Sequence, residues 1–124
     1  MNFLSTLEYQ LIILAYFGQA GVYLITDQAE DALGLPSGYG QQDIPLVLSS
    51  KEYNADGTLH TTQGEDKSLW GDVIHVNGVP WPYLNVQPRK YRFRFLNAAV
   101  SRNFDVVSIP GMNNTQFDCR LTRH

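Results

Sequence analysis

Residues 89–96, in the order Arg-Lys-Tyr-Arg-Phe-Arg-Phe-Leu, constrain the fold of this chain most, because charged and apolar side chains alternate over residues 90–95. A period of two is typical of a β-strand with one buried and one solvated face. The two faces are Tyr91, Phe93 and Phe95 on one side and Lys90, Arg92 and Arg94 on the other. The cationic row could bind an anion, but the simpler interpretation is a solvated strand face.

Composition extends this prediction to the whole chain. Ten Gly, six Pro, seven Tyr, six Phe and two Trp among 124 residues favour many short strands joined by turns, so we expect an all-β fold. The lone cysteine, Cys119, excludes an internal disulfide and a Cys-rich zinc site. A net charge of -3 and a pI near 5.4 argue against nucleic acid as a partner.

Two hairpins are predicted upstream of this strand. Residues 43–50 form an apolar run typical of a strand, and Pro45, which has no N–H to donate, should lie at a strand start or a sheet edge. Residues 54–57, Asn-Ala-Asp-Gly, predict a turn into a return strand over residues 58–62. A second hairpin should join residues 72–76 to residues 79–84 through Asn77-Gly78, a common type I′ turn.

The N-terminal part contains an apolar run and a predicted connection. Residues 11–17 are too few to cross a membrane, and no positive charge precedes them as a secretory signal would require. Localisation therefore stays unknown. Residues 21–26 are β-branched and aromatic, which predicts a buried strand, and the Gly- and Pro-rich residues 28–42 predict a connection.

Three separated motifs, in the family's order, resemble the multicopper oxidases of the bilirubin oxidase and laccase type. The similar stretches are residues 72–78 (DVIHVNG), 80–83 (PWPY) and 88–98 (PRKYRFRFLNA) for the second cupredoxin domain, residues 15–27 for the last strand of the first, and residues 29–40 between them. The family is commonly secreted. The resemblance implies a copper-dependent oxidoreductase that oxidises phenolic or tetrapyrrole substrates one electron at a time and reduces O2 to water.

The resemblance also implies a domain division and an incomplete Greek-key β-sandwich with irregular termini. The expected parts are an unmatched segment (1–14), the last strand of a first cupredoxin domain (15–28), a linker (29–42), the N-terminal half of a second cupredoxin domain (43–108) and an unmatched tail (109–124). Such abrupt loss of similarity at both ends suggests a truncated or mis-assembled gene product.

Copper ligands are not expected in this chain, although the parent family uses copper. Blue and trinuclear copper sites need many imidazoles, usually as His-x-His pairs, and this chain has three histidines and no such pair. His75 falls on a strand that supplies no ligand in the family, and His60 has no partner nearby in sequence. Cys119 and His124 have blue-copper spacing, but Asp118 and Arg120 stand where the family has histidines, so we expect a thiol in an unstructured tail. No catalytic, cofactor-binding or metal residue is therefore predicted.

Besides a free-standing cupredoxin electron carrier, which would need copper on Cys119, His124 and one upstream histidine, an incomplete sandwich has two functional interpretations. The first is an oxidase fragment that is inactive because its copper ligands are missing. The second is a non-catalytic β-rich interaction module that pairs its open strand edges with itself or with a full-length oxidase. Neither interpretation involves a membrane. A sequon at residues 113–115 matters only if the chain is secreted.

Overall fold

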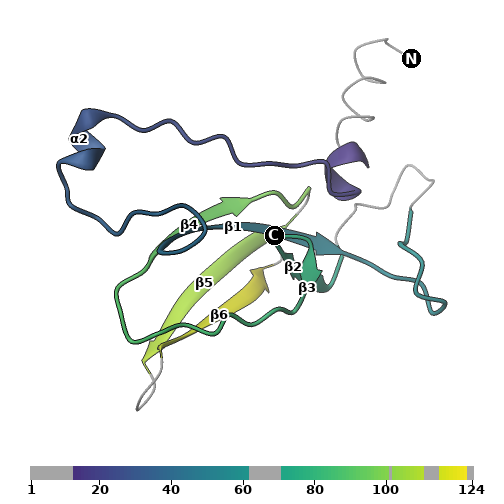
Figure 1. The fold of residues 1–124 in the computed structure, drawn as a ribbon. Helices are drawn as coiled ribbons and strands as arrows, with labels where there is room; N and C mark the ends of the chain where they lie inside the picture. Colours follow the sequence, from purple (N-terminus) through teal and green to yellow (C-terminus); the bar gives the residue numbers. More distant parts are fainter. Residues whose placement is uncertain (1–12, 62–70, 101, 111–114, 123–124) are drawn as a thin grey trace, which may run out of the picture.

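The computed structural model of the chain describes residues 13–61, 71–100, 102–110 and 115–122, with side chains up to residue 107. The described strands form a four-stranded sheet of order β3-β2-β1-β4 and a separate two-stranded sheet of β5 and β6 (Figure 1). The elements are α2 (Gln28–Asp31), β1 (Asp43–Lys51), β2 (Val73–Val76), β3 (Val79–Pro80), β4 (Arg92–Asn97), β5 (Asn103–Pro110) and β6 (Thr115–Thr122). The all-β prediction is confirmed.

Strand β1 is the centre of the larger sheet. It pairs antiparallel with β2, where Ser49 faces His75, and parallel with β4, where Ile44 faces Phe93. The strand predicted over residues 43–50 is thus confirmed and extends one residue further. Strand β4 also forms as predicted, but it begins at Arg92 rather than at residue 89.

Pro45 lies near the start of β1, as its missing N–H predicts. The Gln42 carbonyl accepts from Arg92 of β4 and the Leu48 carbonyl accepts from Ala98 just after β4. In a parallel ladder the even-numbered residues therefore face β4, and Pro45 faces the other side. The antiparallel strand β2 has already ended there, since its last residue, Val76, pairs with Leu48. Instead the Asn77 side chain donates to the Pro45 carbonyl at 3.0 Å and accepts from the Val47 N–H at 2.8 Å. The Asn77 side chain therefore makes the hydrogen bonds to β1 that a neighbouring strand would otherwise make.

The tight turn between β2 and β3 has the predicted conformation. Asn77 and Gly78 have φ values of 51° and 81°, and a positive φ at both central residues defines a type I′ turn. The upstream hairpin is shorter than predicted. It has a single antiparallel bridge between Tyr53 and Leu59, and no regular strand is assigned there among the described residues.

The strand predicted over residues 21–26 does not form. Residues 13–16 make a helical turn, and residues 19–27 run on without regular secondary structure or a paired strand. A β-branched sequence becomes a strand only when another strand completes its hydrogen bonds, and no described strand does so here. The helical turn is anchored instead by Tyr16, whose hydroxyl accepts from the Glu52 N–H at 2.9 Å.

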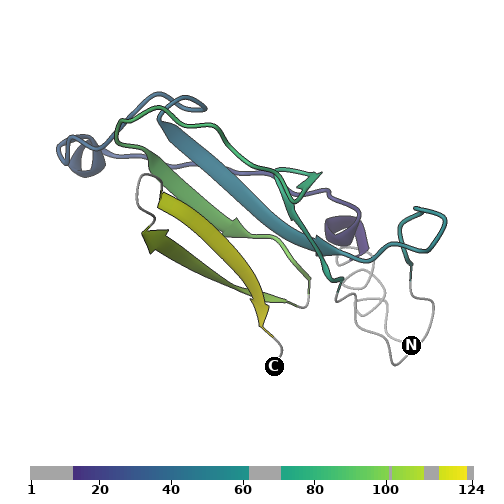
Figure 2. The same ribbon diagram turned by 90° about the horizontal axis from the view of Figure 1, so that it is seen from below.

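The expectation of an irregular C-terminal tail is wrong over residues 115–122. These residues form β6 and pair antiparallel with β5, so that Cys119 lies opposite Val106 in the register. Residues 116–122 alternate between polar and apolar types, which is the strand period that the tail prediction overlooked. The hairpin of β5 and β6 runs roughly along the direction of β1 and β4 (Figure 2).

The core of the described part is small. Its buried hydrophobic side chains are Tyr16, Leu48 and Ile74, while many large apolar side chains are exposed, including Tyr23, Trp81 and Tyr83. No helix in the described residues is both long and apolar enough to span a membrane. The described part of the chain therefore has apolar side chains that its described residues leave uncovered.

Candidate functional site

Four charged side chains meet beside β4, and we call them the acid–base cluster: Glu30, Asp43, Arg92 and Arg94. Arg94 binds Asp43 as a fork, since its Nε donates to Oδ1 at 2.7 Å and its Nη2 donates to Oδ2 at 2.8 Å. The same Nη2 donates to Glu30 Oε1 at 2.7 Å, and Arg92 forms an ion pair with that oxygen. Bidentate, charge-assisted pairs of this kind are the stronger class of hydrogen bond.

The arginines of the acid–base cluster lower the pKa of its two carboxyl groups. Hydrogen bonds from Arg94 and then from Arg92 lower the pKa of Glu30 below its ordinary value. The hydrogen bonds from Arg94 also hold the pKa of Asp43 down, although partial burial opposes the effect. Both carboxylates are therefore ionised at neutral pH, and the two acids balance the two arginines.

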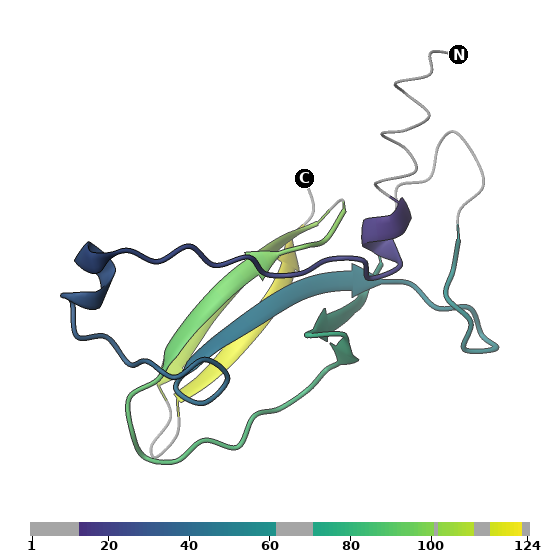
Figure 3. The ribbon, with the colours of Figure 1, turned by 45° about the horizontal axis from the view of Figure 1, so that its top comes forward.

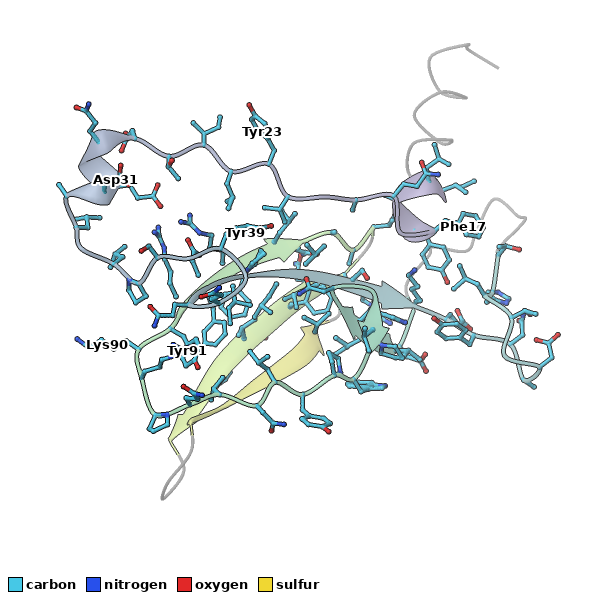
Figure 4. All side chains as sticks on the ribbon, in the orientation of Figure 1. Phe17, Tyr23, Asp31, Tyr39, Lys90 and Tyr91 are labelled. Atoms are coloured by element: carbon cyan, nitrogen blue, oxygen red, sulfur yellow. The ribbon has the colours of Figure 1, made fainter. Side chains whose placement is uncertain are left out.

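The interpretation of the cationic row as a solvated face needs correction. Arg92 and Arg94 are half-buried by their carboxylate partners, with side-chain exposures of 24% and 20%. Lys90, in contrast, points away from the strands (Figure 4). The sequence missed this cluster because Glu30 and Asp43 are more than 50 residues upstream of Arg94 in a predicted linker and at a strand start. The available signal was that these two acids could pair with two arginines of the predicted cationic row.

His75 is the most buried side chain of the described part, with 1% of its surface exposed. Its Nδ1 lies 3.2 Å from the Val73 carbonyl, which can only accept, so Nδ1 carries the proton. Its Nε2 then accepts from the Tyr53 hydroxyl at 2.9 Å. Burial lowers the pKa of His75, so the ring is neutral and both nitrogens are used in structural hydrogen bonds.

The other sequence candidates do not gather around His75. His60 lies in the short hairpin, where its Nδ1 donates to Asn54 Oδ1 at 2.9 Å. Only the backbone of Cys119, on β6, is described. His124 and most of the sequon lie outside the described residues. In the described ranges, no three His, Cys, Asp or Glu side chains form a group that could hold a metal ion. The described donors do not fit a copper centre.

A shallow groove of about 280 Å³ lies between the N-terminal segment and β4. Its lining is mostly apolar: Gly21, Val22, Tyr23, Leu24, Arg94, Phe95 and Leu96. Since Arg94 already binds two carboxylates, it brings no unpaired charge to the groove. The groove is therefore a contact between two parts of the chain rather than a site with convergent polar groups.

Comparison with known proteins supports the same family as the sequence motifs. The chain is 71% identical to bilirubin oxidase of Albifimbria verrucaria over 90 residues, and 52% identical to a laccase of Haloferax volcanii over 92 residues. These matches cover 73% and 74% of this chain but 16% of each relative. No family model matches the chain.

A solved structure agrees with the fold. The crystal structure of the McoA multicopper oxidase from Aquifex aeolicus superposes with a TM-score of 0.68 at 35% identity, covering 82% of this chain and 22% of McoA. The sheet described above is thus a cupredoxin-like β fold. Over the matched part of its length, the chain belongs to the multicopper oxidase family, of the laccase and bilirubin oxidase type.

Proposed function

We propose that this chain is a structural part of a copper oxidase and does not catalyse oxidation by itself. The parent reaction would be one-electron oxidation of phenolic or tetrapyrrole substrates coupled to reduction of O2 to water. In this proposal the chain supplies the end of a first cupredoxin domain, the connection and the start of a second. Copper belongs to the parent enzyme, and no residue of this chain is assigned to it.

The state of His75 carries this proposal. A metal takes an imidazole through an unprotonated nitrogen, but Nε2 of His75 already accepts from Tyr53, and Nδ1 donates to a backbone carbonyl. Binding copper there would break a buried hydrogen bond and leave the Tyr53 hydroxyl without its acceptor. A blue copper site needs two imidazoles and a thiolate. Without His75 as a ligand, only two of the three histidines of this chain are left to supply them.

Copper binding tests the proposal directly. The purified chain is incubated with Cu(II) and dialysed, and its copper content, visible absorption and oxygen uptake with a phenolic substrate are measured. We expect no stoichiometric copper, no intense blue band and no oxygen uptake above that of free Cu(II).

A matched variant makes the result sharper. Cys119→Ser removes the one thiolate that a blue site would need, so wild type and variant should bind the same small amount of copper. If the wild type holds one copper with a blue band that the variant lacks, Cys119 is a ligand and the proposal is wrong.

A second function is favoured by the exposed apolar surface. Leu96 on the edge strand β4 and Val107 on β5 are exposed, and the described core contains few buried apolar side chains. Strand edges and uncovered apolar faces favour pairing with another chain. In this second proposal, the chain is an interaction module that pairs with itself or with a full-length oxidase.

Light scattering tests the interaction module. We expect the mass to rise above 14.0 kDa with concentration, or a complex to form when bilirubin oxidase of Albifimbria verrucaria is added. Leu96→Lys should weaken the association by placing a charge on β4, whereas Tyr83→Lys, outside the strands, should not. A mass of 14.0 kDa at every concentration, with no complex, contradicts this proposal.

A further inference from the structure

We infer that Glu30 is a latch that docks the long connection between the helical turn and β1 onto β4. We call residues 19–38 the strap. The strap crosses the length of the sheet from the helical turn to α2, which lies at its far end (Figures 1 and 3). This inference concerns the chain's own conformation and does not depend on whether the chain binds copper.

Apolar burial holds only one part of the strap, where half-buried Val22 and Leu24 line the groove with Phe95 and Leu96. Tyr23, Ile25 and Leu33 have 88%, 80% and 67% of their surface exposed, and Tyr23 points away from the strands (Figure 4). The strap has no regular structure except α2, a single turn capped by Asp27, which accepts from the Glu30 N–H at 2.8 Å. Beyond residue 24, the far end of the strap therefore depends on polar contacts to keep one position.

The two ends of the strap are anchored separately. Before it, the Tyr16 hydroxyl binds the backbone of Glu52. After it, the Gly40 N–H donates to the Asp43 carbonyl at 2.8 Å. Glu30 lies between these anchors and reaches across to Arg92 and Arg94 on β4. Its two ion pairs therefore tie the far end of the strap to the sheet.

Electrostatics determines when the latch is closed. Arg92 and Arg94 face Glu30 from β4, Asp43 faces the same arginines from β1, and Asp27 and Asp31 are the other acids on or beside α2. Because the pKa of Glu30 is lowered in the folded chain, its contribution is fully present above its ordinary value of 4.5. The contribution is lost as the pH falls through the lowered pKa, and high salt screens it.

Hydrogen exchange measured by mass spectrometry on the full chain tests the latch. Glu30→Gln keeps the shape of the side chain but removes its charge, so we expect amides of the strap to exchange about three- to tenfold faster at pH 7. Asp31→Asn is the matched control, since it removes the neighbouring carboxylate on α2, which has no part in the cluster. In the Asp31→Asn variant, the amides of the strap should exchange at the wild-type rate.

A salt titration separates the latch from a general loss of structure. In the wild type, strap exchange should accelerate as NaCl is raised, while Glu30→Gln should already be fast and respond little. The titration of the wild type gives an answer even if the variant does not fold. The inference is overturned if wild-type strap exchange is insensitive to salt, or if Glu30→Gln and Asp31→Asn behave alike.

Discussion

Replacing Gly71 with alanine is expected to lower the free energy of unfolding by about 3 kcal/mol or more. Gly71 lies two residues before the start of β2 with a φ of 41°, and a Cβ there would overlap the backbone N, Cα and C atoms of Lys51 at the end of β1. Backbone atoms cannot rotate away as a flexible side chain can. The two strands would have to separate where β1 and β2 pair, and urea unfolding followed by circular dichroism would measure the loss.

Gly34→Ala is the matched control for this prediction. Gly34 also has a positive φ, 59°, but an added Cβ would meet no atom within 4 Å. Its substitution should therefore cost about 1 kcal/mol from backbone conformation alone. If the two variants lose equal stability, the close approach of Gly71 to Lys51 is not what requires glycine at position 71.

Ile74→Ala is expected to cost about 2–4 kcal/mol of unfolding free energy. Ile74 lies on β2, opposite Ser50 of β1, and 4% of its surface is exposed. The small core has few other buried apolar side chains to fill the cavity, so most of the lost burial is not recovered. The same urea titration measures the change, and the midpoint should move while the slope stays constant.

The control for this variant is an isoleucine in the strap. Ile25 is 80% exposed, so Ile25→Ala removes the same atoms from water rather than from the core. We expect a change within about 0.5 kcal/mol. A comparable loss in both variants would mean that the sheet around Ile74 is not the stable part of the molecule.

Local sequence chemistry was sufficient to predict the strands next to well-defined turns. Asn77-Gly78 determined a hairpin because both residues tolerate positive φ, and the missing N–H of Pro45 placed it near a strand start. The alternating residues of β4 gave the strand and its aromatic face, where Tyr91 and Phe93 stack with ring centroids 6.0 Å apart. In each case the cause lies within a few residues.

Features that depend on distant partners were not predictable in this way. Residues 21–26 have strand propensity, but no described strand pairs with them, so propensity alone gave a wrong result. The acid–base cluster joins Glu30 to Arg94 across 64 residues, and no local pattern states which acid reaches which arginine. His75 could be assigned a structural role from sequence, but its partner Tyr53 became evident only in the folded chain.

The parallel pairing of β1 with β4 determines the order in which this chain can fold during synthesis. Arg92, the partner of Asp43 in the register, is synthesised about 50 residues later, whereas β2 follows β1 after a shorter interval. At ordinary translation rates the delay is on the order of 2–10 s, and closing the larger loop also costs more chain entropy. For that time β1 is paired only with β2, over residues 48–51, and its other side is accessible to chaperones and to neighbouring nascent chains.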